Sequence, residues 1–298
     1  MSNHNKKHAY LIMAHNNFSQ LQMLVSLLDD SRNDIYLHID KKSKAFRCED
    51  IHVQHSKLVF IDRIRVNWGG HSQIVCEMNL LRAAAPQHYQ YYHLLSGIDL
   101  PLKTQDEIHD FFNRSYPNNF IRFDEVANRT GSFLPRISQY HILQDTIGRN
   151  AGKFIAVLER LEHYSLLLQN KIGISRKQYI QAYKGTNWFS ITDPLVQHIL
   201  DNEKLIRRQF YYSICADEVF LHSVAMASPY RDHIVNNSLR AIDWKRGTPY
   251  TFRQADVEEL LSSPNLFGRK FDINIDPNAV DDVVAFLSAS SKFNNKTY

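Results

Sequence analysis

The segment AYLIMAHNN (Ala9–Asn17) places six apolar residues directly before three polar ones. A run of this length fits a buried strand, and polar residues after a strand fit the ligand-binding edge of an open α/β sheet. The same pattern returns in DIYLHIDKK (Asp34–Lys42) and in YYHLLSGID (Tyr91–Asp99). Apolar residues at helical spacing lie between these segments, in Phe18–Leu28 and His71–Ala85. Strands that alternate with helices predict an α/β fold with a mostly parallel sheet flanked by helices.

The rest of the chain continues this pattern with one interruption. A helix is predicted over Thr104–Phe112, where Thr104 and Glu107 have the spacing of a capping box. Residues 129–184 change character, and the apolar periodicity of Phe154–Leu168 predicts a helical insertion or lid within a single domain, residues 1–298. Further strands are predicted at Lys57–Ile61, Asn187–Thr192 and Phe267–Phe271, and further helices at Pro194–Leu205, Asp217–Ala227, Asp256–Leu261 and Asn278–Leu287.

Composition places the chain among ordinary globular proteins. Apolar residues make up 44% and charged residues 22% of its 298 residues, which excludes disordered and collagen-like chains. The net charge of +4 suits an anionic ligand and is too small for a nucleic-acid-binding protein. Three cysteines without a paired spacing indicate a reducing compartment. Met1–His8 is polar and no segment reaches the roughly 18 apolar residues of a membrane span, so we expect a cytoplasmic protein without signal or anchor.

Polar residues after the predicted strands are the first candidates for a ligand site, because ligands bind at the carboxyl ends of the strands in such sheets. His15 follows the first strand, and Asp40 the second. Asp40 fits a ribose or base contact and a simple turn equally well. Trp68 and Gly69 belong to NWGGHS before a helix, where glycines let the backbone approach an anion, although a Gly-Gly turn is more often structural. Asp99 either binds sugar hydroxyls or caps its turn.

Two charged pairs later in the chain are the other candidates. Asp217 and Glu218 open a predicted helix, where acids interact favourably with the helix dipole and where one of them can equally serve as a general base. Arg269 and Lys270 either neutralise a diphosphate or lie solvated on the surface. The chain has no H-E-x-x-H, no cysteine cluster and no D-x-D, so no metal and no other cofactor is predicted.

Eight segments in their order resemble one family: AYLIMAHNN, IYLHIDKKS, VNWGGHS, HLLSGIDLPLKT, GTNWFSIT, ADEVFLHSV, LRAIDW and LFGRKFD. Together they are similar to the core-2/I-branching enzymes, glycosyltransferase family 14, from about residue 8 to residue 276. That family includes β-1,6-N-acetylglucosaminyltransferases and peptide O-xylosyltransferases. The resemblance implies a GT-A-like fold, a UDP-sugar donor, inversion at the anomeric carbon and catalysis without a metal, with basic side chains on the donor diphosphate.

The resemblance also implies roles for single residues. Glu218 matches the general base of the family, although Asp99 falls where some members place a carboxylate that has been considered for the same role. Asp40 matches an acidic position near the uracil, and Lys270, with Arg269 beside it, matches a cation on the diphosphate. The remaining positions at the donor site are His15, Trp68 and Gly69. The sugar or acceptor cleft would contain Trp188 and Asp217. A second cation for the diphosphate would come from Lys245, Arg246 or Arg253.

We therefore expect an inverting, metal-independent transferase that moves a sugar, first of all β-linked N-acetylglucosamine, from a UDP-sugar to a hydroxyl of a glycan acceptor. The alternatives are a donor with xylose or another hexose, a binding protein without catalysis, and a glycoside hydrolase with two facing carboxylates. Eukaryotic members carry an anchor and disulfides, so the chain resembles a soluble bacterial-type member. Its glycan acceptor, a lipid-linked one included, implies at most peripheral membrane association. Basic residues in Lys171–Lys184 either hold that surface or form a solvated loop.

Overall fold

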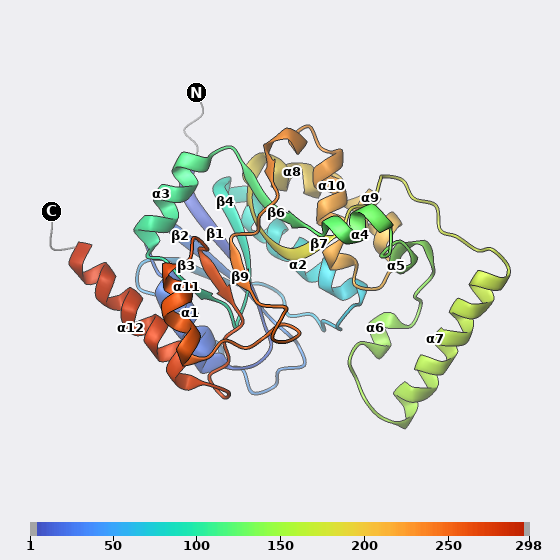
Figure 1. The fold of residues 1–298 in the computed structure, drawn as a ribbon, viewed down its shortest axis with the longest axis horizontal. Helices are drawn as coiled ribbons and strands as arrows, with labels where there is room; N and C mark the ends of the chain where they lie inside the picture. Colours follow the sequence, from blue (N-terminus) through green and yellow to red (C-terminus); the bar gives the residue numbers. More distant parts are fainter. Residues whose placement is uncertain (1–4, 295–298) are drawn as a thin grey trace.

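The computed structural model describes residues 5–294, with side chains for residues 7–290. Residues 1–4 of the polar stretch Met1–His8 lie outside this range. The first half of the main sheet consists of parallel strands in the order β3-β2-β1-β4 (Figure 1). These strands are β1 (Asn5–Ala14), β2 (Asn33–Ile39), β3 (Lys57–Phe60) and β4 (Tyr89–Ser96). Each lies where the alternation of apolar runs and helices predicts it.

The second half of the sheet partly reverses this direction. β7 (Gly185–Thr192) is antiparallel to β4 and to β6 (Asn119–Phe123), and the short β8 (Ile234–Val235) is parallel to β6. Within residues 5–294 the main sheet has seven strands in the order β3-β2-β1-β4-β7-β6-β8. The sheet is mostly parallel, as expected. The sequence analysis missed β6, because NFIRF is short and contains an arginine among its apolar residues.

Helices cover both faces of the main sheet (Figure 1). Side chains alternate along β1, so that Ala9 and Leu11 belong to one core cluster and Tyr10 and Ile12 to the other. The first cluster includes α2 (His71–Ala84), α8 (Asp193–Asp201), α9 (Glu203–Phe210) and α10 (Phe220–Ala227), and the second includes α1 (Phe18–Leu28), α3 (Gln105–Ser115), α11 (Val257–Ser262) and α12 (Pro277–Asn294). The site therefore has to lie at an edge of the sheet, because both faces are filled.

Two predicted helix starts have different outcomes. Thr104 is the N-cap of α3, with the complete capping box to Glu107. By contrast, Asp217 and Glu218 do not open an α-helix, because they form the short 3-10 turn η3 (Ala216–Glu218) and α10 begins only at Phe220. The preceding residue, Cys215, has a φ of 48°, which bends the chain just before the two acids. The prediction of one helix over Asp217–Ala227 was wrong for this reason.

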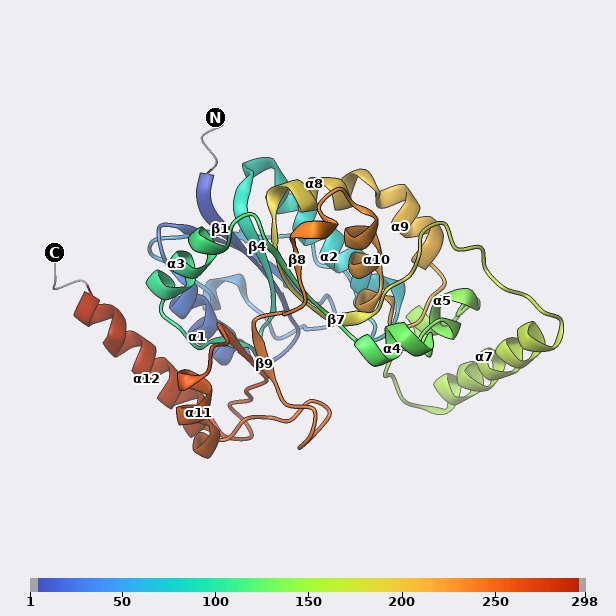
Figure 2. The same cartoon turned by 45° about the horizontal axis from the view of Figure 1, so that its top comes forward.

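Residues 129–184 contain most of the short helices and the outermost helix of the molecule. These are the end of α4 (Glu125–Thr130), α5 (Pro135–Ser138), α6 (Gln144–Ile147) and α7 (Lys153–Lys171). Figure 2 shows α7 at one end of the molecule, away from the sheet. Arg176, in the basic segment after α7, is buried and donates to the Gln209 carbonyl at 2.7 Å and to the Ser213 hydroxyl at 2.9 Å. This arginine therefore fixes the insertion and is not part of a solvated loop.

A small second sheet carries the C-terminal part to the carboxyl end of β4. It consists of β5 (Leu100–Pro101), β10 (Phe267–Arg269) and β9 (Arg240–Ile242), in the order β5-β10-β9. The expected strand Phe267–Phe271 is present in a shorter form. Because β5 follows β4 after only three residues, β10 brings Arg269 and Lys270 to the edge of the main sheet where ligands bind.

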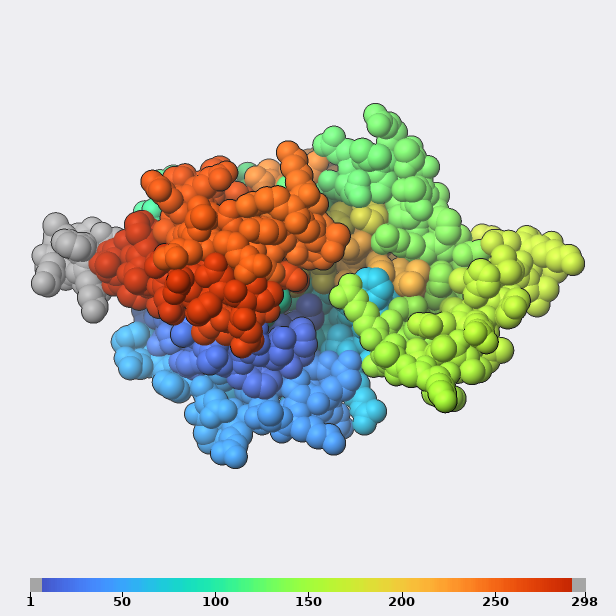
Figure 3. All heavy atoms as spheres, turned by 60° about the horizontal axis from the view of Figure 1, so that its bottom comes forward, coloured from blue at the N-terminus to red at the C-terminus, as the bar shows by residue number. Residues whose placement is uncertain are grey.

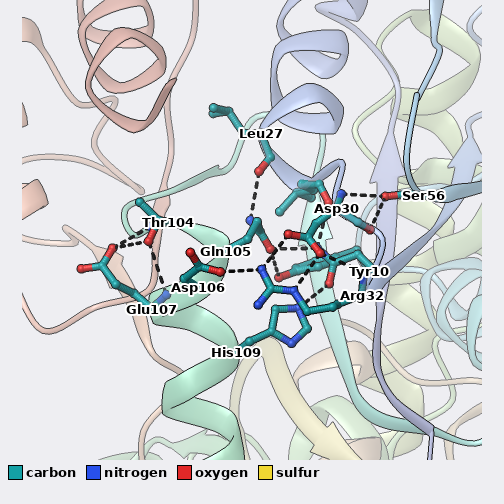
Figure 4. A network of polar contacts seen from close by, with 12 residues as sticks. Tyr10, Leu27, Asp30, Arg32, Ser56, Thr104, Gln105, Asp106, Glu107 and His109 are labelled. Atoms are coloured by element: carbon teal, nitrogen blue, oxygen red, sulfur yellow. Dashed lines mark hydrogen bonds and ion pairs between the residues drawn. The ribbon is translucent and has the colours of Figure 1, made fainter. Parts of the chain in front are cut away.

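The amino end of β2 is fixed to α3 by a network of polar contacts (Figure 4). Arg32 forms ion pairs with Asp30 at 2.7 Å and with Asp106 at 2.8 Å. His109 on the same helix bonds the Asn33 amide oxygen at 2.8 Å and is 3% exposed. The network holds α3 at the end of the sheet opposite to the expected ligand edge. The helices described between residues 5 and 294 all lack the combination of length and apolarity that crossing a bilayer requires.

Two buried histidines predict that the fold is sensitive to mild acid. Burial lowers the pKa of His109 and of His222 to about 4. In the unfolded chain both protonate near pH 6.5, so the unfolded state binds more protons between these values, and stability is lost as the pH falls from about 6.5. We expect His109→Gln, which keeps a donor for Asn33, to reduce the loss of unfolding free energy between pH 7 and pH 5 by about 2 kcal/mol. Urea unfolding at the two pH values measures it.

The exposed His163 provides the control for this measurement. His163→Gln should leave the pH dependence as it is in the unmodified protein. An equal loss of stability in His109→Gln and in the unmodified protein would contradict a neutral His109.

Candidate active site

Asp99 is a fully buried carboxylate at the end of β4, and both of its oxygens are bonded. Oδ2 accepts the Ser96 backbone N–H at 2.8 Å, and Oδ1 accepts the Ser96 hydroxyl and Arg269 Nη1, each at 2.8 Å. Such bonds offset the cost of taking a charge out of water. The pair joins the carboxyl end of β4 to the end of β10.

Trp188 on β7 completes this cluster in a way that differs from the expectation. The guanidinium carbon of Arg269 lies 4.2 Å from the centre of its ring, a cation–π distance. The indole is 8% exposed and belongs to the core cluster that also contains Ala216 and Val219. The ring face toward Arg269 is thus occupied, which leaves little room for the sugar stacking that the sequence suggested.

Glu218 has a different environment, because its side chain is 35% exposed. Oε2 pairs with Arg136 at 3.0 Å and with Lys184 at 3.5 Å. Among the described residues Oε1 has no recorded partner. The sequence analysis did not connect Arg136 or Lys184 with Glu218, because both come from the insertion and its flank, far away along the chain. The basic character of residues 171–184 was the available signal for Lys184.

Asp217 points the other way, into the protein. It is 7% exposed, and its Oδ2 accepts Gln73 Nε2 at 2.9 Å, whereas Oδ1 has no hydrogen-bond partner among the described residues. Burial, followed by the charge of Glu218, raises the pKa of Asp217 to about 7. Asp217 therefore does not line an open sugar cleft.

Glu77 on α2 is a second buried acid next to Asp217. It is completely buried, and within the described part of the chain neither of its oxygens has a hydrogen-bond partner. Burial, followed by the charge of Asp217, raises the pKa of Glu77 well above its ordinary value. The sequence analysis missed this residue, although a glutamate in the apolar face of His71–Ala85 was a visible signal.

Asp40 and His15 lie together at the ends of β2 and β1. Asp40 is 6% exposed, its Oδ1 accepts the Lys42 backbone N–H at 2.8 Å, and its Oδ2 lies 3.4 Å from the Lys42 ammonium. Asp40 thus forms the turn that was one of its two interpretations. His15 is exposed and interacts electrostatically with Asp40, Lys42 and Arg269. The ends of β1 and β2 therefore lie near Arg269 of the Asp99–Arg269 pair.

The Trp68–Gly69 loop contacts the turn that carries the acids. The Gly69 carbonyl accepts the Cys215 N–H at 2.8 Å, and Gly69 has a φ of 70°, a conformation that favours glycine. Trp68 is exposed, and the Arg149 guanidinium lies 4.1 Å from its ring centre. At Gly70 a Cβ would stand 2.0 Å from Asp145 of α6, so the second glycine permits a close approach of the insertion.

Lys270 is the half-buried cation of the pair in LFGRKFD, and its ammonium has no partner among the described residues. The three candidates for a second cation differ. Arg246 is engaged by Asp243 at 2.5 Å and by Asp256 at 2.7 Å, and Arg253 donates to the Ile275 carbonyl at 3.0 Å. Lys245 is exposed, and in the described part of the chain its side chain has no partner.

Segments that carry some of these residues border a hollow in the surface. Figure 3 shows it between the C-terminal segment in orange, the N-terminal part in blue and the insertion in yellow-green. The structure thus gathers Asp99, Arg269 and Trp188 at one corner and Glu218 with its two cations toward the insertion. Within residues 5–294, no group of three or more His, Cys, Asp or Glu side chains has a geometry that could hold a metal ion.

Comparison with known proteins decides the family. The model of the Core-2/I-Branching enzyme family matches residues 8–262, most of the chain. The chain belongs to the Core-2/I-branching enzyme family. The family model covers the main sheet, the insertion and the Glu218 turn, which confirms the family resemblance; seven of the eight segments lie within the match, and LFGRKFD lies beyond it. The family is one of glycosyltransferases, and its GT-A-like fold class agrees with the mostly parallel sheet described above.

Among curated members of this family, xylosyltransferase 2 of Rattus norvegicus is 24% identical over 305 residues, which are 92% of this chain and 33% of that protein. Xylosyltransferase 1 of Homo sapiens is 23% identical over 311 residues, 94% of this chain and 30% of that protein. The chain therefore spans about a third of the length of the curated relatives it matches.

A solved structure, mouse xyloside xylosyltransferase 1 in its apo form, matches 87% of this chain and 97% of its own. Its TM-score is 0.38 and its sequence identity is 10%, and at this level the similarity supports no conclusion about the site.

Asp217→Asn should stabilise the protein at high pH. The folded pKa of about 7 exceeds the value of 3.8 for a free side chain, so the stability that Asp217 contributes is complete at low pH and is lost as the pH rises through about 7. Asparagine carries no charge and still accepts the Gln73 bond. We expect a gain of roughly 2–4 kcal/mol in unfolding free energy at pH 8 and little change at pH 4, measured by urea unfolding.

The exposed Asp232 is the matched control, and Asp232→Asn should change stability little at either pH. A variant Asp217→Asn that is less stable than the unmodified protein at pH 8 would contradict the raised pKa of Asp217.

Proposed function

We propose that the protein is an inverting glycosyltransferase that moves a sugar from a UDP-sugar to a hydroxyl of a glycan acceptor, with Glu218 as the general base. The observation that carries this proposal is the free Oε1 of a half-exposed Glu218, whose other oxygen is oriented by Arg136 and Lys184. A general base must be within hydrogen-bond reach of the hydroxyl whose proton it takes. The partial exposure of the Glu218 side chain leaves Oε1 open to such a contact.

The other two carboxylates, those of Asp99 and Asp217, are bonded or buried, which supports Glu218 as the base. Both oxygens of Asp99 are bonded to Ser96 or Arg269, so proton abstraction by Asp99 would require breaking a buried ion pair. Asp217 faces the protein interior. In the proposed reaction Glu218 takes the proton of the acceptor hydroxyl. The oxygen of that hydroxyl forms the bond to the anomeric carbon at the same time. The bond from this carbon to the UDP oxygen breaks on the opposite face, and the electron pair leaves with UDP.

The donor side of the proposal rests on charge. UDP leaves as a diphosphate whose developing negative charge needs neutralisation, and oriented cations are an effective way to provide it. Lys270 is the cation there whose ammonium is not engaged by the described residues, whereas Arg269 is held by Asp99 and Trp188. Lys245 is the remaining candidate for a second cation. We propose that these side chains act without a metal, and that Asp40, His15 and the Trp68–Gly69 loop contact the nucleotide.

The sugar and the acceptor are the finer part of the proposal. N-acetylglucosamine follows from the resemblance to β-1,6-N-acetylglucosaminyltransferases, and xylose follows from the names of the curated relatives. A panel of UDP-sugars in a thermal-shift assay separates the two, because the donor that binds the folded state raises its apparent stability. The acceptor is a glycan, and a lipid-linked glycan is the form we propose to test first.

Glu218→Gln is the variant that tests the base. Glutamine keeps the size and the contact with Arg136 but accepts no proton, so we expect UDP release in the presence of donor and acceptor to fall by about 10²–10⁴-fold with UDP affinity unchanged. Asp99→Asn is the comparison, and we expect its main effect to be on stability, a loss of about 3 kcal/mol from the broken buried pair. Near-normal turnover in Glu218→Gln would reject Glu218 and favour Asp99.

Lys270→Ala tests the diphosphate site. Removing a charge-assisted bond to the diphosphate should weaken UDP binding by roughly 10–100-fold in isothermal titration. The exposed Lys204 on α9 is a matched control, and Lys204→Ala should bind UDP normally. Both titrations and the turnover assay are run in excess EDTA. Unchanged UDP affinity in Lys270→Ala removes this lysine from the site, and activity that returns only with added Mn²⁺ refutes the metal-independent mechanism.

A further inference from the structure

α7 buries two polar side chains and exposes a row of large apolar ones, unlike an ordinary surface helix. Its two buried residues are Glu162 and Gln169. Ile155, Leu158 and Leu166 are half-buried, whereas five other apolar side chains are between 52% and 69% exposed: Phe154, Val157, Leu161, Tyr164 and Leu168. Large apolar surfaces left in water are rare in soluble proteins and mark sites of interaction.

The five exposed side chains form one continuous stripe. They follow each other at intervals of three, four, three and four residues, the spacing that places side chains on one side of a helix. Beyond the helix end the exposed Ile172 and Ile174 extend the apolar surface. The stripe therefore runs along the whole of α7. Figure 2 shows this helix at the outer end of the molecule.

Hydrogen bonds on the polar side hold the stripe outward. The Gln169 side chain accepts the Tyr140 backbone N–H at 2.7 Å and donates to the Tyr140 carbonyl at 3.0 Å. Glu162 accepts the Leu143 N–H at 3.2 Å, and its other oxygen lies 3.7 Å from His141. Rotating α7 to bury its apolar residues would break these bonds. The exposed stripe is thus built into the insertion.

Basic residues line one border of the stripe. Lys153, Arg160 and Lys171 are seven and eleven residues apart, which is two and three helical turns, so they form a single row beside Val157 and Tyr164. Glu159 lies nine residues before Leu168 and therefore about 180° around the helix from it. Residues 149–177 contain six basic and two acidic residues, a net charge of +4. That equals the net charge of the whole chain, so the remainder is balanced.

We propose that α7 docks the protein on an anionic lipid surface, with the apolar stripe in the interface and the basic row on the lipid phosphates. An amphipathic helix with aromatic and aliphatic residues on one side and Lys or Arg beside them binds in this way. The docking does not rest on the proposed sugar transfer, because it is measured without donor or acceptor.

The charge pattern disfavours a second copy of this chain as the occupant. Antiparallel pairing of two stripes would bring basic row against basic row, and Glu159 is on the far side and cannot compensate. Parallel pairing would bring the basic row against the side of the partner helix that carries Glu162 and Gln169, which is already packed against residues 140–143. A lipid surface requires neither arrangement.

Co-sedimentation of the full chain with vesicles tests the proposal. We expect binding to vesicles of phosphatidylcholine and phosphatidylglycerol in equal parts, and little binding to pure phosphatidylcholine. Phe154→Ser combined with Leu161→Ser should weaken binding by about tenfold or more, because less apolar surface enters the interface. Arg160→Gln and Lys171→Gln should each weaken it by roughly fivefold. Both apolar residues are exposed, so the variant should fold, which circular dichroism verifies.

Matched controls use exposed residues of the same types elsewhere in the chain. Phe286→Ser on α12 and Lys204→Gln on α9 should bind anionic vesicles like the unmodified protein. The proposal is overturned if the unmodified protein stays in the supernatant with anionic vesicles, or if the α7 variant sediments equally well. Sedimentation velocity without lipid gives the third outcome. A dimer that Phe154→Ser with Leu161→Ser dissociates would assign the stripe to a second copy and refute lipid docking.

Discussion

The ion pair between Asp99 and Arg269 is the constraint on which the rest of the site depends. A carboxylate at zero exposure is tolerated only with a partner and full hydrogen bonding, and Arg269 together with Ser96 provides both. Arg269 is the last residue of β10, so this requirement places the small sheet at the carboxyl end of β4. The same guanidinium covers Trp188 on β7. Three segments distant in sequence therefore meet at one charge pair, and the neighbouring Lys270 is carried to the strand edge with them.

The neighbouring acids show how environment divides roles among identical functional groups. Asp217 and Glu218 are adjacent in a 3-10 turn, yet one faces Gln73 and the interior and the other faces Arg136, Lys184 and solvent. Burial raises the pKa of Asp217 to about 7, so near neutral pH it adds only part of a negative charge beside Glu218. A fully charged neighbour would repel the base and the departing diphosphate alike. The turn thus presents one carboxylate to solvent at limited electrostatic cost.

The sequence predicts the features that depend on local pattern. Apolar runs followed by polar residues located β1, β2 and β4, and the Thr104–Glu107 spacing located the start of α3, because strand burial and helix capping are decided within a few residues. Contacts between distant segments were out of reach. The antiparallel direction of β7, the pairing of Glu218 with Arg136 and the burial of Glu77 depend on how the elements pack. For the acid pair, the left-handed Cys215 precedes a 3-10 turn where the apolar pattern favoured an α-helix, and of the two acids Glu218 is the one that stays partly exposed.

α7 is the clearest example of a feature that the sequence pattern alone could not predict. The apolar periodicity located the helix, since Leu161 and Leu168 are two turns apart. The periodicity does not indicate which side of the helix faces the protein. The deciding side chains are Glu162 and Gln169, whose bonds to backbone groups of residues 140–143 fix which side of the helix faces the protein. The positive excess of the whole chain then falls in the segment around this exposed stripe. The proposed docking on an anionic surface therefore accounts for a net charge that first suggested an anionic substrate, and the nucleotide site proposed at Lys270 would be a small, separate positive site.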